Sequence, residues 1–338
     1  MFFYHLQYTI PAAYRGEAFA LGTSGVGFFF VLSGYVLGLR HGGADFNLKE
    51  YGTRRLARVY PLHLVTFAVW SYFYFAAWGN PLIEKFNSGV ANLLLLHSMF
   101  AGHLFPLGFN AVSWSISCEA VFYTLFPLIR APQRAIACVL GVSAALLLIS
   151  IVDGAGKIYS FYPDFFYFNP FARLSEFALG IYASGKFSGL KLKHPTTLEL
   201  LSLATAGVLL WGQSTVPLEL HQLYLAPAFA FVVVVFGCDS GFISRILRWE
   251  VLVLLGDASY GFYLWHHMIL RWLGEHIGSL LISQPPGFKV AAIAAMLLGI
   301  TVFSIISHRY IELPLRRKVT NFLLGPGRID KRREAGAP

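Results

Sequence analysis

Three polar side chains at helical spacing are the most informative group in this chain. Ser115, Glu119 and Tyr123 are four residues apart, so a helix through them places a carboxylate one turn from a hydroxyl on either side. That arrangement predicts a polar site, suited to acid–base work or to binding a polar substrate. A purely structural interpretation makes Ser113 a helix cap and Trp114 an interfacial aromatic, but it leaves Glu119 unexplained.

A second group is basic. Residues 54–61 read RRLARVYP, and Arg54 and Arg58 are one helical turn apart, with Arg55 between them. Paired guanidinium groups can grip phosphate groups through two hydrogen bonds each. Short basic runs also determine the orientation of membrane proteins, so the spacing by itself leaves both readings open.

Other ionisable groups lie inside apolar segments, where each costs about 2.5–3.5 kcal/mol or more to insert. Arg173 and Glu176 are three residues apart and could bind a ligand or neutralise each other. Tyr260 and His266 share another segment, and His5 lies near the start of the chain, where a lone histidine is either a base or a packing residue. His266 and its neighbour in sequence point about 100° apart on a helix, so no metal site is expected.

Apolar segments of nearly membrane-spanning length contain these groups. A helix needs about 20 residues to cross a bilayer. We therefore predict an all-α integral membrane protein of about ten transmembrane helices. The first is formed by residues 1–14 and is incomplete, as if its inner turns preceded Met1. The other segments are 20–39, 60–78, 112–129, 133–152, 169–185, 196–212, 222–238, 250–272 and 287–308.

Composition and charge agree with a membrane protein and predict its orientation. The chain is 56% hydrophobic and only 13% charged, with a mean hydropathy of +0.60, which leaves too little polar surface for a soluble domain. Most of the 26 lysines and arginines fall in alternate loops and the tail, which places those loops and both termini in the cytoplasm. The net charge of +9 then attracts anionic membrane lipid, and no nucleic-acid partner is required.

One domain accounts for nearly the whole chain. We predict a membrane domain over residues 1–324 and a basic, disordered cytoplasmic tail over 325–338. Gly34 and Gly38 form a small-xxx-small pattern, which predicts that the helix they share approaches a neighbour closely.

Taken in order, five stretches resemble acyltransferase family 3, a family of multi-pass membrane proteins. Each stretch is a weak signal alone, but together they cover almost the whole chain in the family's order. They are GVGFFFVLSGY (25–35), RRLARVYP (54–61), SWSISCE followed by FY (113–123), GDASYGFYLWH (256–266) and YIELP (310–314).

The resemblance implies roles for the residues singled out above. His5 falls at the family's first-helix histidine and would be the general base, although the arginine that precedes that histidine in the family would lie before Met1. An acyl-coenzyme A donor, with acetyl-coenzyme A the expected form, would place its phosphates against Arg54, Arg55 and Arg58. Glu119 would act with His5 by orienting the histidine or the acceptor. The acceptor pocket would comprise Trp114, Ser115, Tyr123, Arg173, Glu176, Tyr260 and His266.

The implied reaction moves an acyl group onto a hydroxyl of a cell-surface or exported glycan at a bacterial inner membrane. A separate extracytoplasmic protein could complete the transfer, because the tail is too short for a second domain. The alternative is a multi-pass transporter or flippase of a glycan or lipid-linked precursor, which also needs polar groups in the membrane. A non-catalytic scaffold would not explain His5 and Glu119.

Overall fold

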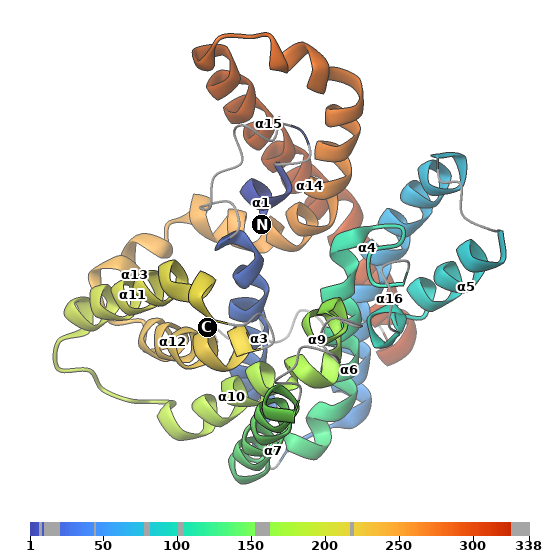
Figure 1. The fold of residues 1–338 in the computed structure, drawn as a ribbon. Coiled ribbons are helices and arrows are strands. Elements are labelled where there is room, and N and C mark those ends of the chain that lie inside the picture. Colours follow the sequence, from blue (N-terminus) through green and yellow to red (C-terminus); the bar gives the residue numbers. More distant parts are fainter. Residues whose placement is uncertain are drawn as a thin grey trace.

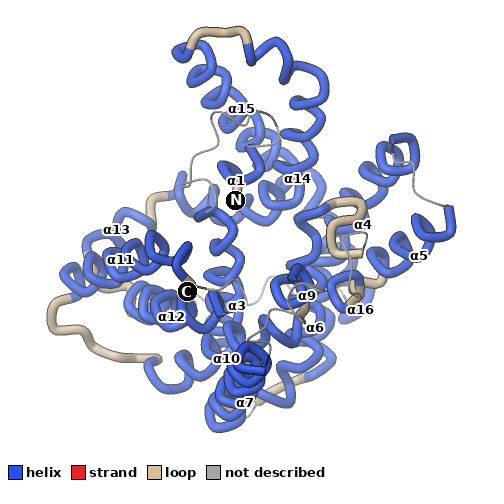
Figure 2. Tube along the Cα trace, in the orientation of Figure 1, coloured by secondary structure: helices blue, strands red, loops and turns tan. Residues whose placement is uncertain are grey.

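The protein is described by a computed structural model, which covers residues 1–6, 9, 21–43, 45–77, 82–100, 105–152, 163–216 and 220–325. These residues form helices joined by loops and contain no strand (Figure 2). The longer helices are α3 (Gly25–His41), α4 (Leu48–Ala77), α5 (Leu82–Leu93), α6 (Trp114–Ile129), α7 (Pro132–Val152), α10 (Pro170–Phe187), α11 (Pro195–Gly212), α12 (His221–Gly237), α14 (Glu250–Ile282), α15 (Pro286–Ser307) and α16 (Leu313–Leu324). Shorter ones are α1 (Phe2–Leu6), α9 (Pro163–Phe168) and α13 (Phe242–Leu247).

Helix α3 lies at the centre and packs closely against α10 (Figure 1). A methyl group added at Gly34 would overlap the carbonyl oxygen of Phe177, and one added at Gly180 would overlap that of Val31. The two backbones therefore touch where neither helix carries a side chain. The close approach predicted from Gly34 and Gly38 is confirmed, because Gly38 in turn leaves room only for Ser184 of α10.

Two apolar cores flank the polar site. One joins α3, α6 and α10 through Phe30, Phe122 and Phe177, whose rings lie 5.0 Å apart in successive pairs. The other joins α4, α6 and α14 through Leu62, Ile116 and Leu264. Helix α6, which carries Ser115, Glu119 and Tyr123, is thus held between two sets of helices.

Helices α14 and α15 run side by side as a hairpin, and α1 lies against it (Figure 1). Phe2 and Leu6 of α1 pack with Leu270 of α14 and Ile300 of α15 in a small core of their own. This packing fixes the short α1, and with it His5, on the hairpin. A π-helical segment, His308–Glu312, then links α15 to α16.

Each predicted apolar segment from 20–39 onward coincides with a helix. Within the described residues, four helices are long and apolar enough to cross a membrane by length and composition: Leu21–His41, Ala111–Ile129, Pro132–Val152 and Pro286–Leu324. The all-helical prediction is therefore confirmed for the described part of the chain. About ten crossings and two cytoplasmic termini stay predictions. Much of segment 1–14, and the tail from 326 onward, lie outside the described residues.

Candidate active site

The face predicted on α6 is present. Tyr123 Oη donates a hydrogen bond to Glu119 Oε2 over 2.9 Å, one helical turn away. The guanidinium of Arg55 on α4 lies 5.7 Å from the centre of the Tyr123 ring. Glu119 also interacts electrostatically with Arg55 and Arg58. The carboxylate predicted to be functional thus has a hydroxyl and two cations around it.

Ser115 extends this polar face toward α14. Its hydroxyl lies 2.7 Å from the hydroxyl of Tyr263, and Tyr263 also donates to the Val112 carbonyl oxygen over 2.9 Å. These bonds tie the stretch 113–123 to the stretch 256–266, which are far apart in the sequence. Tyr263 is a site residue only because α14 packs here, and the sequence alone did not place it beside Ser115.

Three histidine rings meet where α1 lies on α14. The His5 ring centre is 5.2 Å from that of His266 and 4.7 Å from that of His267. His5 is only 8% exposed, and His266 is completely buried. Within the described residues, no group of three histidine, cysteine or acidic side chains could hold a metal ion. Because the three rings lie this close together and are almost completely buried, they form a candidate site for proton transfer.

A cavity of about 320 Å³ lies against one of these histidines, His266, between α1, α3, α14 and α15. Its wall is mainly apolar and includes Phe2, Phe29, Leu255 and Phe262, while His266 and Tyr263 provide polar groups. Since Tyr263 is also bonded to Ser115, the cavity and the polar face of α6 are parts of one site.

The three arginines of the stretch 54–61 are not equivalent. Arg54 Nε forms an ion pair with Glu50 at 2.9 Å, and Arg58 Nη1 forms one with Glu312 at 2.8 Å. Arg55 has no ion pair with a described carboxylate, and its buried Nε has no hydrogen-bond partner among the described residues. An anionic ligand would therefore reach Arg55 without breaking an ion pair with a described carboxylate, although the Glu119 carboxylate lies in its electrostatic range.

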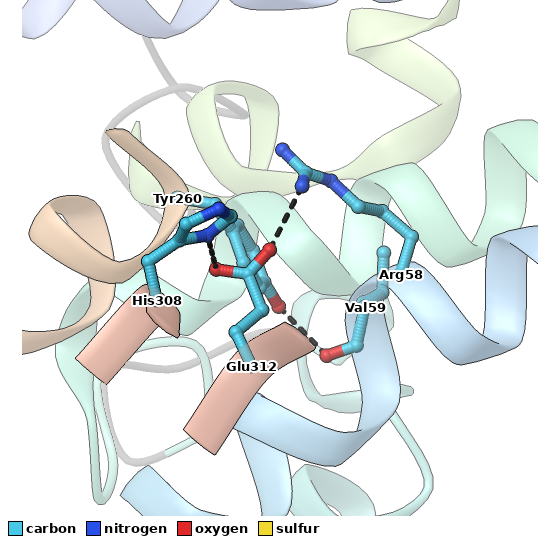
Figure 3. Close-up of polar contacts among 5 residues, drawn as sticks. All are labelled: Arg58, Val59, Tyr260, His308 and Glu312. Carbon is cyan, nitrogen blue, oxygen red and sulfur yellow. Dashed lines mark hydrogen bonds and ion pairs between the residues drawn. The ribbon is translucent and has the colours of Figure 1, made fainter. Parts of the chain in front are cut away.

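Glu312 is the acidic residue of the stretch YIELP (310–314), and its sequence alone indicates no role for it. Its side chain is 2% exposed and accepts from Arg58 Nη1, while His308 Nδ1 lies 3.1 Å from its other oxygen. Figure 3 shows Arg58 reaching from α4 to this carboxylate, with Tyr260 and His308 beside it. The Tyr260 hydroxyl donates to the Val59 carbonyl oxygen over 2.7 Å, and its ring centre lies 5.4 Å from Arg58. Tyr260 of α14 is therefore in contact with Arg58 of α4 and not with the cavity.

Trp114 of α6 and the pair Arg173 and Glu176 of α10 lie where α6 faces α3 and α10. Arg173 and Glu176 form a buried ion pair at 2.9 Å, as the neutralising alternative predicted. Arg173 lies over the rings of Phe30 and Tyr167, and Trp114 packs against the same two rings. The structure places these three residues in the aromatic core, and their predicted part in acceptor binding stays a prediction.

Ser113 does not cap α6, contrary to the structural interpretation given above. It occupies the residue before the helix, but its side chain makes no cap hydrogen bond. Its hydroxyl lies 3.2 Å from Asn92 Oδ1 and 3.1 Å from His97 Nε2. A buried polar contact with a distant segment replaces the local one, because burial leaves Asn92 and His97 in need of partners.

The pairing of Arg58 with Glu312 predicts a stability effect. Arg58→Gln should lower the free energy of unfolding by about 3 kcal/mol, because it leaves the buried Glu312 carboxylate without this partner, and Glu312→Gln should cost less, because Arg58 is 30% exposed. Thermal unfolding in detergent measures the loss. The double variant should lose less than the sum of the two, and additive losses would show that the two side chains do not interact.

Comparison with known proteins shows which family this chain belongs to. Residues 1–307 match the family described as "Acyltransferase domain". The chain belongs to that family. It is therefore an acyltransferase, of the kind that transfers groups other than aminoacyl groups. No solved structure matches it.

Similar proteins point the same way. This acyltransferase is 29% identical to "Acyltransferase MdmB" of Streptomyces mycarofaciens, over 88% of this chain and 81% of that protein. It is 24% identical to "Exopolysaccharide production protein ExoZ" of Rhizobium meliloti, over 92% of this chain and 96% of that protein. It is 23% identical to "Putative peptidoglycan O-acetyltransferase YrhL" of Bacillus subtilis, over 87% of this chain and 50% of that protein.

Proposed function

We propose that this acyltransferase moves an acetyl group from acetyl-coenzyme A to a hydroxyl of a cell-surface or exported glycan, at a bacterial inner membrane. The observation that carries the proposal is the meeting of His5 with His266, whose ring centres are 5.2 Å apart beside an apolar cavity. A hydroxyl attacks a thioester only after a base removes its proton, and a neutral imidazole can do so. Two of the similar proteins have names that refer to exopolysaccharide and peptidoglycan.

His5 is the general base in this proposal. It takes the proton of the acceptor hydroxyl, the hydroxyl oxygen forms a bond with the acetyl carbon, and the thiolate of coenzyme A leaves. Glu119 and Tyr123 hold polar groups of the substrates at the α6 face, and Ser115 and Tyr263 line the way to the cavity.

The test uses the purified protein in lipid nanodiscs with acetyl-coenzyme A labelled in the acetyl group and a glycan fraction from the cell envelope. Base-labile label on the glycan is the expected result, since an ester is formed. A transporter would instead move the glycan across a vesicle membrane and leave it chemically unchanged. Transfer that requires an added extracytoplasmic extract would identify a separate protein that completes the reaction.

Donor binding supplies a second test. Arg55→Gln should raise the KM for acetyl-coenzyme A about tenfold, because a charge-assisted hydrogen bond contributes about 1.5–3 kcal/mol. Arg248→Gln is the matched control, since Arg248 forms only an exposed ion pair with Asp239. An unchanged KM in the Arg55 variant would exclude this arginine as a phosphate contact.

A further inference from the structure

His266 has a feature that general-base catalysis by His5 does not use. Its Nδ1 lies 2.8 Å from the Tyr263 carbonyl oxygen and 3.1 Å from that of Phe262. Carbonyl oxygens only accept, so in the neutral ring Nδ1 carries the hydrogen and Nε2 carries the lone pair. The helix itself therefore fixes the tautomer in which Nε2 is the nucleophilic atom.

The Nε2 atom is buried and has no hydrogen-bond partner among the described residues. Buried polar atoms without partners are rare in folded proteins and call for an explanation. The ring is held in place by stacking on Phe262, at an interplanar angle of 8° and a centroid distance of 5.6 Å. His266 also lines the cavity of about 320 Å³. A fixed, unpartnered nucleophile thus lies beside a mainly apolar pocket that is open on one side.

The cavity is large enough for an acyl group that is bound covalently to the protein as an intermediate. A cavity of about 150 Å³ lined by apolar side chains is large enough for benzene, so this one has room for an acetyl group and for part of a second substrate. Its wall, which includes Phe29 and Phe262, is mainly apolar and so offers few hydrogen-bonding groups to hold water beside a reactive acyl group. Acyl-imidazoles hydrolyse when water reaches them, so such a wall is what a covalent intermediate would need.

We propose that His266 is acylated during turnover and passes the acyl group to the acceptor, an inference that rests on the proposed function. In the first step the Nε2 lone pair attacks the thioester carbonyl carbon and the carbon–sulfur bond breaks. The sulfur leaves with the bonding electrons as the thiolate of coenzyme A, which leaves an acyl-imidazolium on His266. In the second step the acceptor hydroxyl attacks that acyl carbon while His5 takes its proton, and the carbon–nitrogen bond breaks to restore neutral His266. His5 then passes its proton to the thiolate formed in the first step, so that free coenzyme A carries the hydrogen of the acceptor hydroxyl.

The scheme gives the two neighbouring histidines different tasks. His5 is needed only when the acceptor is attacked, whereas His266 is needed in both steps. Variants at the two positions should therefore separate the half-reactions, which a direct transfer between donor and acceptor cannot do.

The deciding experiment measures exchange of label between acetyl-coenzyme A and free coenzyme A, with the purified full chain and no glycan present. The wild-type protein and His5→Ala should both catalyse exchange, while His266→Gln should be slower by about a hundredfold or more. His276→Gln is the matched control, because His276 lies on the same helix but is exposed and stacked on Trp272. Intact wild-type protein, transferred within seconds into cold organic solvent and weighed by mass spectrometry, should carry one acetyl group, and His266→Gln should carry none.

The outcomes separate this inference from the proposed function. Glycan acetylation by the wild-type protein without exchange, and without label on the protein, would overturn the acyl-His266 step and leave the function intact. Exchange that persists in His266→Gln would also overturn it. Neither exchange nor transfer, with donor binding absent, would overturn both. If His266→Gln still binds the donor and unfolds at the wild-type temperature, its loss of exchange is a loss of chemistry and not of the fold. Exchange by His5→Ala tests the scheme independently, because that variant keeps His266.

Discussion

Replacing His5 by alanine is expected to lower kcat for glycan acetylation by about a hundredfold or more, the usual contribution of a general base. His5 lies on α1 with its ring 4.7 Å and 5.2 Å from those of His267 and His266, so no bulk water surrounds it to act in its place. His5→Gln should behave like His5→Ala, because an amide can accept a hydrogen bond but cannot hold the proton. The KM for acetyl-coenzyme A should change little, since the proposed function assigns donor binding to the arginines on α4.

The control for this substitution is His276→Ala, at an exposed histidine on the same helix that carries His266. It should keep wild-type turnover. If His5→Ala kept more than about a tenth of the wild-type kcat, the loss would be below what general-base catalysis contributes, and His5 would be a packing residue.

Local spacing predicted contacts within one helix. The four-residue spacing of Glu119 and Tyr123 predicted that they share a face, and there the structure has a hydrogen bond. The three-residue spacing of Arg173 and Glu176 left ligand binding and mutual neutralisation open, and the structure has the ion pair. The same rule applied to Glu50 and Arg54 would have indicated that Arg54 is already paired. Without Glu50, the stretch RRLARVYP contains nothing that distinguishes its three arginines from one another.

Contacts between helices could not be predicted in this way. Arg58 and Glu312 meet because the π-helical segment turns the carboxylate toward α4, and no short-range pattern encodes that rotation. The same holds for His5 and His266, which meet only because Phe2 and Leu6 pack on the hairpin of α14 and α15. Family motifs indicated which residues belong to a site. Their partners depend on tertiary packing, which a single sequence does not specify.

The polar face of α6 depends on how closely α3 and α10 pack, and this gives a second large expected effect. Gly34→Ala should lower the free energy of unfolding by about 3 kcal/mol, and should lower the yield of monodisperse protein in detergent. The added methyl group would overlap the Phe177 carbonyl oxygen, and a backbone atom within a helix cannot move aside as a side chain can.

Helix propensity alone would make Gly→Ala stabilising, so the same substitution at a packed and at an unpacked position should change stability in opposite directions. Alanine is favoured over glycine inside a helix by about 1 kcal/mol, so an isolated α3 would gain stability from the same change. Gly207→Ala on α11 and Gly141→Ala on α7 are matched controls, because nothing lies within 4 Å of the added methyl group at either position. Both should unfold at or above the wild-type temperature. If Gly34→Ala did the same, α3 and α10 would not be in backbone contact, and α3 would not hold Phe30 against α6 as described.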